Sequence, residues 1–240
     1  MNYLRKNNRK YDEMREVMII PQFCPAALGS VLYSCGNTQV ICAVSQAPQV
    51  PQHAIDKGIG WITAEYTILP YATNPRTERR SLRPDGRSVE IQRLIGRSLR
   101  TVLDLEALQG ISLVVDCDVL QADGGTRTAA ISGAYIALQF AVNKLLQQNV
   151  LVDNPIKAKV AAISIGYIGN DLLLDLEYEE DSQCDVDMNV VMDSNNNIIE
   201  IQGSGEKRSY SLKELDDMLQ LASKGIQKIF KIQNDVLKLQ

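Results

Sequence analysis

The chain has 240 residues, 45% of them hydrophobic, and carries a formal net charge of −4 with a pI near 5.2. Its only histidine, His53, lies in a proline-rich stretch that we expect to be a loop, and this scarcity argues against His-dependent nucleophiles and histidine-ligated metals. The five cysteines are odd in number and never spaced Cys-x-x-Cys, which argues against a disulfide framework or zinc site. We expect a cytoplasmic protein without a signal peptide or membrane contact.

The first half of the chain predicts strands followed by a helix. Alternating and β-branched residues predict strands at residues 16–24, 30–34, 38–46 and 61–69, the second and third joined as a hairpin. Residues 71–87 are polar, basic and interrupted by prolines, which predicts a long exposed loop. Apolar spacing predicts a helix over residues 88–108, with solvated arginines on its opposite face, namely Arg93, Arg97 and Arg100.

Residues 119–130 carry the most informative motif, a strand that turns on two glycines into a helix. The β-branched run 111–120 predicts a strand, and the proline-free run from Thr126 to about residue 148 predicts a helix. Gly124 and Gly125 permit the turn and a close approach by a ligand. Free N–H groups at a helix start attract anions, and Arg127 adds a guanidinium that can bind two oxygens. A plain glycine turn before a buried helix is an equal alternative.

The second half repeats this order of strands and helix. After a linker at 149–155, strands are predicted at 160–168, 172–178, 186–192 and 198–202. A capping box from Ser211 to Glu214 opens an amphipathic helix that runs toward the C-terminus. We therefore expect an α+β fold of two βα subdomains, residues 1–148 and residues 149–240.

Charge is segregated along the chain. Residues 76–100 hold eight of the thirteen arginines against three acidic residues, a balance of +5. Residues 171–217 hold fourteen acidic residues against three basic ones, a balance of −11. The basic region could bind phosphates and the acidic region could bind a cation. Alternatively, the two regions could be solvated surfaces that attract each other, which explains part of the pattern. The preference for arginine over lysine favours bidentate phosphate recognition.

Carboxylates crowd the segment 179–189 of the acidic region. Such crowding is typical of a Mg²⁺ or Mn²⁺ site or of an acid with a raised pKa, but acidic loops are also common on surfaces. Asp187 is the more specific candidate for such a site, because it stands at the start of an apolar strand and can face inward.

Four segments together resemble the ribonuclease PH family of phosphate-dependent 3′-exoribonucleases. They are Gly60–Tyr66 (GWITAEY), Gly86–Arg100 (GRSVEIQRLIGRSLR), Asp116–Ala129 (DCDVLQADGGTRTA) and Glu179–Ser182 (EEDS) with Asp187–Met192 (DMNVVM). The resemblance spans nearly the whole chain. It implies the two-subdomain fold of that family, which is similar to domain 2 of ribosomal protein S5, with mixed sheets packed against helices.

The resemblance also implies roles for individual residues. Inorganic phosphate would attack the last phosphodiester of RNA, so that a nucleoside diphosphate leaves and no protein nucleophile is needed. The attacking phosphate would be held by Arg87, Gly125, Thr126 and Arg127. Asp181 and Asp187 would serve catalysis and hold Mg²⁺ or Mn²⁺, with the division of labour between them left open.

Partners follow from the same resemblance. Arg76 and Arg79 match residues that help to hold tRNA, and family members form hexameric rings of three dimers. The expected substrates are the 3′ ends of tRNA precursors, and the reverse reaction would add nucleotides. Tyr71 stands where the family usually has an arginine, and a tyrosine there could stack on a base. A non-catalytic, RNA-binding ring subunit is the alternative.

Overall fold

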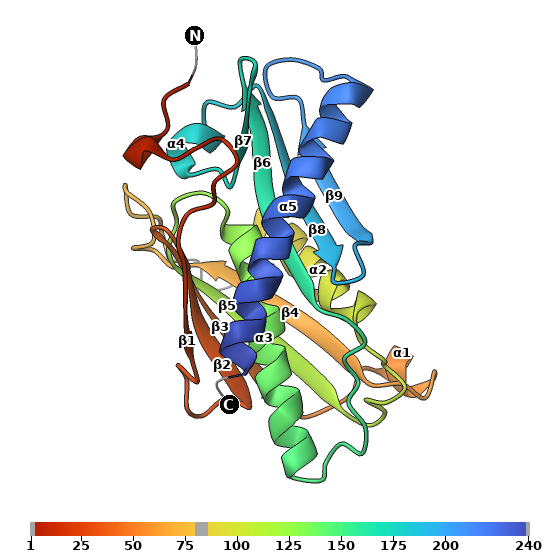
Figure 1. Cartoon of the computed structure of the whole chain (residues 1–240). Helices are drawn as coiled ribbons and strands as arrows, with labels where there is room; N and C mark the ends of the chain where they lie inside the picture. The colour runs from red at the N-terminus through yellow and green to blue at the C-terminus, as the bar shows by residue number, and fades with distance from the viewer. Residues whose placement is uncertain (1–2, 80–85, 239–240) are drawn as a thin grey trace.

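A computed structural model describes residues 3–79 and 86–238. Residues 80–85 of the expected loop 71–87, which include Arg80, Arg83 and Asp85 of the basic segment, lie outside the described residues. Two β-sheets and three long helices dominate the fold (Figure 1). In chain order the elements are η1 (Lys6–Asn8), β1 (Val17–Pro21), β2 (Gly29–Cys35), β3 (Thr38–Gln46), α1 (Gln52–Ile55), β4 (Trp61–Ile68), α2 (Gly86–Thr101), β5 (Ser112–Gln121), α3 (Thr126–Gln147), β6 (Val160–Ile168), β7 (Asp171–Leu174), α4 (Tyr178–Asp181), β8 (Val186–Asp193), β9 (Ile198–Ser204) and α5 (Leu212–Leu237).

The first sheet has the strand order β1-β2-β3-β5-β4. Neighbouring strands are antiparallel except β4 and β5, which run parallel and are connected through α2. A parallel pair needs such a crossover, because a tight turn can only reverse the chain. As a result β4 and β5 end at the same edge of the sheet, where the helices α2 and α3 also begin.

Helix α3 lies at the centre of the molecule. It packs on β2 and β3 of the first sheet and also contacts β6 of the second sheet and α5. Its apolar residues surround the whole helix, as expected for a helix buried on all sides. The helix is long and apolar enough to cross a membrane by composition, but 78% of that stretch is buried inside the protein, which identifies a core helix.

The second sheet is antiparallel, with the order β7-β6-β8-β9. Helix α5 covers it, contacting β6 and β8, and begins at the predicted capping box, where the Ser211 hydroxyl accepts from the Glu214 N–H at 3.2 Å. The main core, between the first sheet and α2 and α3, also includes Val160, Ala162 and Val191 of the second sheet. The α+β class expected from the sequence is therefore confirmed.

Three predicted boundaries are wrong for local reasons. The first strand ends at Pro21 instead of residue 24, where Gln22 has a φ of 53°. Strand β7 ends at Leu174 instead of residue 178, since Asp175 has a φ of 56° and Glu177 then forms a capping box with Glu180 at the start of α4. The helix expected to reach residue 108 ends at Thr101 and continues in turns.

Three polar side chains make contacts that the sequence did not indicate, and His53 lies in a helix where a loop was expected. His53 lies in the short helix α1, with its ring edge-on to Trp61 at a centroid distance of 4.5 Å. Arg100 lies over the same indole at 4.7 Å, and Arg97 of α2 pairs with Glu200 of β9 at 2.6 Å. The last pair joins the basic and acidic regions within one chain. All five cysteines are free, and all of them except Cys24 are buried.

Candidate active site

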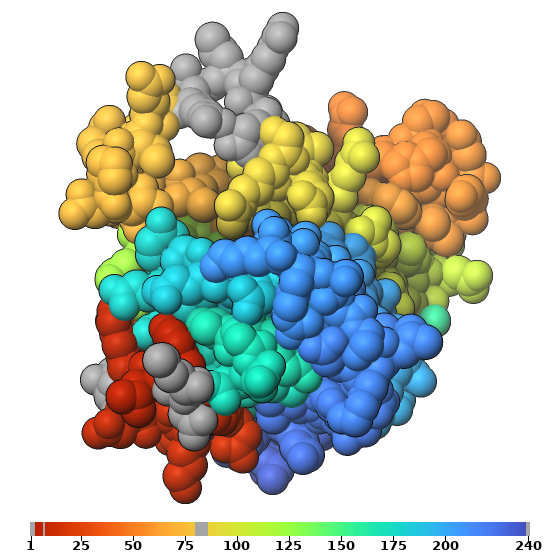
Figure 2. All heavy atoms as spheres, turned by 90° about the horizontal axis from the view of Figure 1, so that it is seen from above, coloured from red at the N-terminus to blue at the C-terminus, as the bar shows by residue number. Residues whose placement is uncertain are grey.

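A pocket of about 940 Å³ opens where the ends of β4 and β5 meet the starts of α2 and α3. Helix α4 and strand β8 of the second sheet complete its wall. Every residue that the sequence assigned to catalysis or phosphate binding lines it: Arg87, Gly125, Thr126, Arg127, Asp181 and Asp187. The expected RNA contacts Arg76 and Arg79 do not line this pocket and lie exposed in the loop after β4. That loop projects from the molecule in Figure 2.

The turn between β5 and α3 has the geometry that the two glycines suggested. Gly124 and Gly125 have φ values of 72° and 64°, a conformation that L side chains rarely adopt. A Cβ at Gly124 would lie 2.5 Å from the Leu176 carbonyl oxygen. The loop therefore packs directly on the backbone of the segment before α4, and helix α3 starts at Thr126 with its N-terminus at the pocket.

A hydrogen bond from Tyr66 fixes the side chain of Thr126. The Tyr66 hydroxyl donates to Thr126 Oγ1 at 2.8 Å, in a place where burial raises the pKa of Tyr66. Since Oγ1 accepts this bond, the hydroxyl of Thr126 keeps its own proton to donate, and no acceptor for it exists among the described residues. An oxyanion in the pocket would supply that acceptor.

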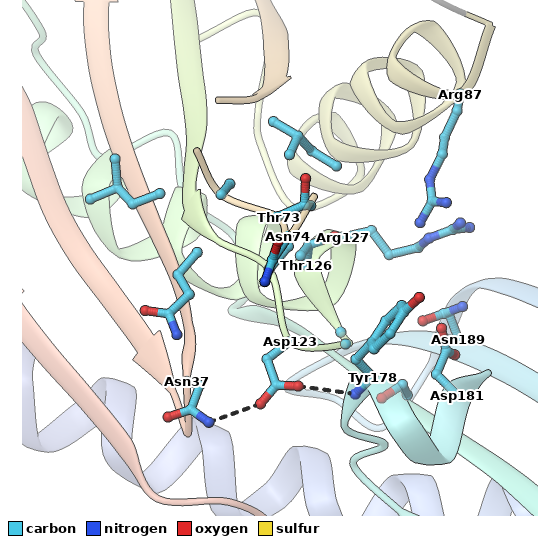
Figure 3. A pocket seen from close by; sticks show the side chains of 18 of the residues that line it. Asn37, Thr73, Asn74, Arg87, Asp123, Thr126, Arg127, Tyr178, Asp181 and Asn189 are labelled. Atoms are coloured by element: carbon cyan, nitrogen blue, oxygen red, sulfur yellow. Dashed lines mark hydrogen bonds between the residues drawn. The ribbon is translucent and has the colours of Figure 1, made fainter. Parts of the chain in front are cut away.

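Two guanidinium groups converge above this turn. Arg87, from the start of α2, and Arg127, from the start of α3, point to the same region in Figure 3. One edge of Arg127 is held from outside the pocket, because Nη1 donates to Gln202 Oε1 at 2.8 Å and lies 3.7 Å from Glu90 Oε1. Two like charges brought together beside a helix N-terminus form an anion-binding arrangement.

Asp181 of helix α4 and Asp187 of strand β8 line the pocket together with these arginines. Burial raises the pKa of Asp181, while the charges of Arg87 and Arg127 act to lower it. Burial also raises the pKa of Asp187, and the nearby charge of Asp181 raises it further. Asp187 Oδ1 is buried and has no hydrogen-bond partner among the described residues. A buried carboxylate oxygen without a partner fits a cation ligand, and hard cations prefer such oxygens.

The described residues contain no group of three His, Cys, Asp or Glu side chains that could enclose a metal by themselves. The pair of Asp181 and Asp187 fits the chemistry of Mg²⁺, which usually takes one or two carboxylates and fills its other positions with water or substrate phosphate.

The sequence did not single out several other residues of the pocket. Asn189 lines it together with Asp187, since alternate residues of a strand share a face, and this spacing could have revealed it. Tyr178 is another such residue, and it lines the pocket with Tyr71, which the sequence did indicate; each is 63% exposed. Asp123 accepts from the Asn37 side chain at 3.1 Å and from the Tyr178 N–H at 3.3 Å, joining β2–β3, the glycine turn and α4 (Figure 3).

Comparison with known proteins agrees with the sequence resemblance. Residues 13–142 match the model of the 3′ exoribonuclease family, domain 1, and residues 159–225 match domain 2 of that family. The chain is 51% identical to ribonuclease PH of Syntrophomonas wolfei over 97% of its own length and 98% of that protein. It is 46% identical to ribonuclease PH of Crocosphaera subtropica, over 99% of both chains.

Solved structures give the same result. A chain of the Archaeoglobus fulgidus exosome with RNA bound to the active site has a TM-score of 0.80 and 28% identity, covering 95% of this chain and 91% of its own. Rice Rrp46 shares the fold alone, with 18% identity and a TM-score of 0.80 over 98% of this chain and 100% of its own. The protein therefore belongs to the 3′ exoribonuclease family, among the ribonuclease PH proteins.

Proposed function

We propose that this protein is a phosphorolytic 3′-to-5′ exoribonuclease. Inorganic phosphate attacks the last phosphodiester of an RNA, a nucleoside diphosphate leaves, and the RNA keeps a new 3′-hydroxyl. In reverse, the enzyme adds nucleotides from nucleoside diphosphates. The observation that carries the proposal is one pocket in which an anion-binding turn and two arginines face two carboxylates. Because phosphate is itself the nucleophile, the near absence of histidine is no obstacle.

Arg87, Gly125, Thr126 and Arg127 are proposed to bind the attacking phosphate. The N–H groups at the start of α3 and the Thr126 hydroxyl donate to its oxygens, and the two guanidinium groups neutralise its charge. These donors stay in place as charge builds on the transferring phosphorus, so they favour the transition state. The rigid turn then holds two anionic reactants together that would otherwise repel each other.

Asp181 and Asp187 are proposed to act on the leaving group. A carboxyl with a raised pKa retains a proton at a higher pH and can pass it to the departing 3′-oxygen. We further propose that the same pair holds Mg²⁺ or Mn²⁺, with the unpartnered Asp187 Oδ1 as one ligand. Such an ion would neutralise charge on the phosphates.

The mouth of the pocket suits a single-stranded RNA end. Tyr71 and Tyr178 offer exposed rings on which bases can stack without regard to sequence. Arg76 and Arg79 lie exposed beyond Tyr71 and can contact the phosphate backbone. We propose that the substrates are tRNA precursors and that these two arginines contact the tRNA.

Assembly and location complete the proposal. We propose a homo-hexamer of three dimers in the cytoplasm, built from subdomains 1–148 and 149–240. A non-catalytic ring subunit is less well supported, since an RNA-binding scaffold has no chemical need for both the phosphate-binding turn and the paired carboxylates.

The test is product analysis with an RNA that carries a radiolabelled 3′-terminal nucleotide. The protein is incubated with and without phosphate and Mg²⁺, and the released nucleotide is identified by chromatography. The proposal predicts nucleoside diphosphate only when both are present, and none with Asp187→Asn. Nucleoside monophosphate in the absence of phosphate would show hydrolysis, and RNA binding without turnover would favour the scaffold.

A further inference from the structure

Three arginines near the N-terminus are buried without contacting the pocket. Arg5, Arg9 and Arg15 have side chains that are 0%, 10% and 7% exposed. Burying a charge is costly unless it is paired and hydrogen-bonded, and a pair of apolar residues is often at least as stabilising. Stability alone therefore does not account for three arginines in this short segment.

Arg5 holds helix α4 through Glu180. Its Nε and Nη2 donate to the two Glu180 carboxylate oxygens, both at 2.7 Å, and both side chains are fully buried. Arg5 Nη2 also donates to the carbonyl oxygens of Leu174 and Asp175, at 2.9 and 3.0 Å. Arg9 adds a third bond to Glu180, at 3.0 Å. One guanidinium thus joins the end of β7 to the end of α4.

Arg15 holds the other side of the same segment through Asp175. Arg15 Nη2 and Nε donate to the two Asp175 oxygens at 2.6 and 3.0 Å, and the Arg15 backbone N–H donates at 2.7 Å. Burial by itself raises the pKa of Asp175, but the charge and hydrogen bonds of Arg15 outweigh burial and lower the pKa. The fourth contact, from Arg15 Nη1, goes to the carbonyl oxygen of Asp123 in the glycine turn.

These contacts hold residues on both sides of the pocket, next to the carboxylates and in the glycine turn. Glu180 precedes Asp181, and α4 has only four residues, so the position of Glu180 fixes the residue beside it. Arg15 Nη2 lies only 3.1 Å from where a Cβ on Gly125 would be, directly behind the proposed phosphate site. Figures 1 and 2 show the N-terminal segment lying beside the segment that carries α4.

We propose that Arg5 and Arg15 are positioning residues that set the distance between the carboxylate wall and the phosphate-binding turn. Arg5 orients Asp181 through Glu180, on the side of the pocket where Mg²⁺ or Mn²⁺ would be held. Arg15, which is paired with Asp175, fixes the glycine turn through the carbonyl oxygen of Asp123. This inference rests on the proposed function of the pocket. Neither arginine lines the pocket, so each substitution should act on ligand binding through the segment that the arginine holds.

The test measures direct binding to the full-length protein, without turnover. Arg5→Lys and Arg15→Lys keep the positive charge but cannot donate two parallel hydrogen bonds to one carboxylate. Leu145→Ala is the control, since it removes core volume near the far end of α3, away from the pocket. Mn²⁺ binding is followed by the loss of its free-ion signal in electron paramagnetic resonance, inorganic phosphate binding by calorimetry, and folding by thermal denaturation.

The expected result is a split between the two ligands. Arg5→Lys should raise the Mn²⁺ dissociation constant at least tenfold and change that of phosphate less than twofold, whereas Arg15→Lys should mainly weaken phosphate. Leu145→Ala should lower the melting temperature and leave both constants within twofold. If a lysine variant is unfolded at the assay temperature, both binding measurements are made for it and for the wild type at a temperature below the melting temperature of the variant.

The proposal would be overturned by variants that lose stability with both dissociation constants unchanged, or by equal losses of affinity for both ligands. A wild-type protein that binds no Mn²⁺ would also overturn it, whatever its activity. Failure of the proposed function is distinguishable, because it would appear as missing nucleoside diphosphate in the wild-type reaction.

Discussion

Replacing Arg127 by lysine should damage phosphate use far more than RNA binding. Lysine keeps a positive charge at the start of α3 but cannot donate two parallel bonds to one phosphate. It also cannot reproduce the geometry in which one guanidinium edge bonds Gln202 at 2.8 Å while the other edge remains for a ligand. The substitution therefore removes about one charge-assisted hydrogen bond from the proposed phosphate site.

Such a bond contributes about 1.5–3 kcal/mol. Because each 1.4 kcal/mol is a factor of ten, the phosphate KM should rise roughly 10- to 150-fold. Arg127→Ala should do at least as much. Arg93→Lys is the matched control, since Arg93 is exposed on the same helix as Arg87 and does not line the pocket.

Initial rates are measured against phosphate concentration at saturating RNA, and RNA affinity by fluorescence anisotropy without phosphate. The account predicts an RNA dissociation constant within about threefold of wild type, as expected for one retained charge among several. An unchanged phosphate KM, or equal losses of phosphate use and RNA affinity, would refute the role assigned to Arg127.

Three more predictions concern the turn, the carboxylates and the buried ion pairs. Gly124→Ala should lower the free energy of unfolding in urea by at least about 2 kcal/mol, because its Cβ would collide with backbone atoms. Gly110→Ala is the control: it also has a positive φ, of 79°, but open space around the new Cβ, so it should cost only about 1 kcal/mol. Mn²⁺ binding should weaken as the pH falls. Because the pKa of Asp187 is raised above the ordinary aspartate value of 3.8, this weakening should begin at a higher pH than it would for an ordinary aspartate. In the same titration, Asp187→Asn should bind Mn²⁺ at least tenfold more weakly than the wild type. Asp175→Asn should lose about 3–5 kcal/mol of stability at pH 7. Folding lowers the pKa of Asp175, so its contribution to stability is present above about pH 3.8 and is lost as the pH falls below that value. The free energy of unfolding of Asp175→Asn should therefore change less on acidification than that of the wild type. Equal costs at the two glycines, pH-independent Mn²⁺ binding, or parallel acid profiles would each contradict the corresponding argument.

Features set by neighbouring residues could be predicted from the sequence. Helix α3 starts at Thr126 as expected, because the two glycines allow the turn and the residues after them favour a helix. The capping box at Ser211 marks the start of α5 for the same reason. Asp187 was expected to face inward from the apolar residues around it, and its Oδ1 is indeed buried.

Features that depend on distant partners could not be predicted. Arg5 and Glu180 are 175 residues apart, so no local pattern indicates that they form a buried pair. The early end of β7 has a similar cause, since Asp175 leaves the strand and binds Arg15 instead. The grouping of Arg87 with Asp181 came from resemblance to a family, because spacing alone does not bring them together.

Inorganic phosphate is the proposed nucleophile of the reaction. The most direct measurement uses phosphate labelled with ¹⁸O, an RNA with a free 3′ end and Mg²⁺, with the released nucleotide examined by mass spectrometry. The terminal phosphate group of the nucleoside diphosphate should carry the label from phosphate, and no label should enter from ¹⁸O-water. Label from water in a released nucleoside monophosphate would contradict it.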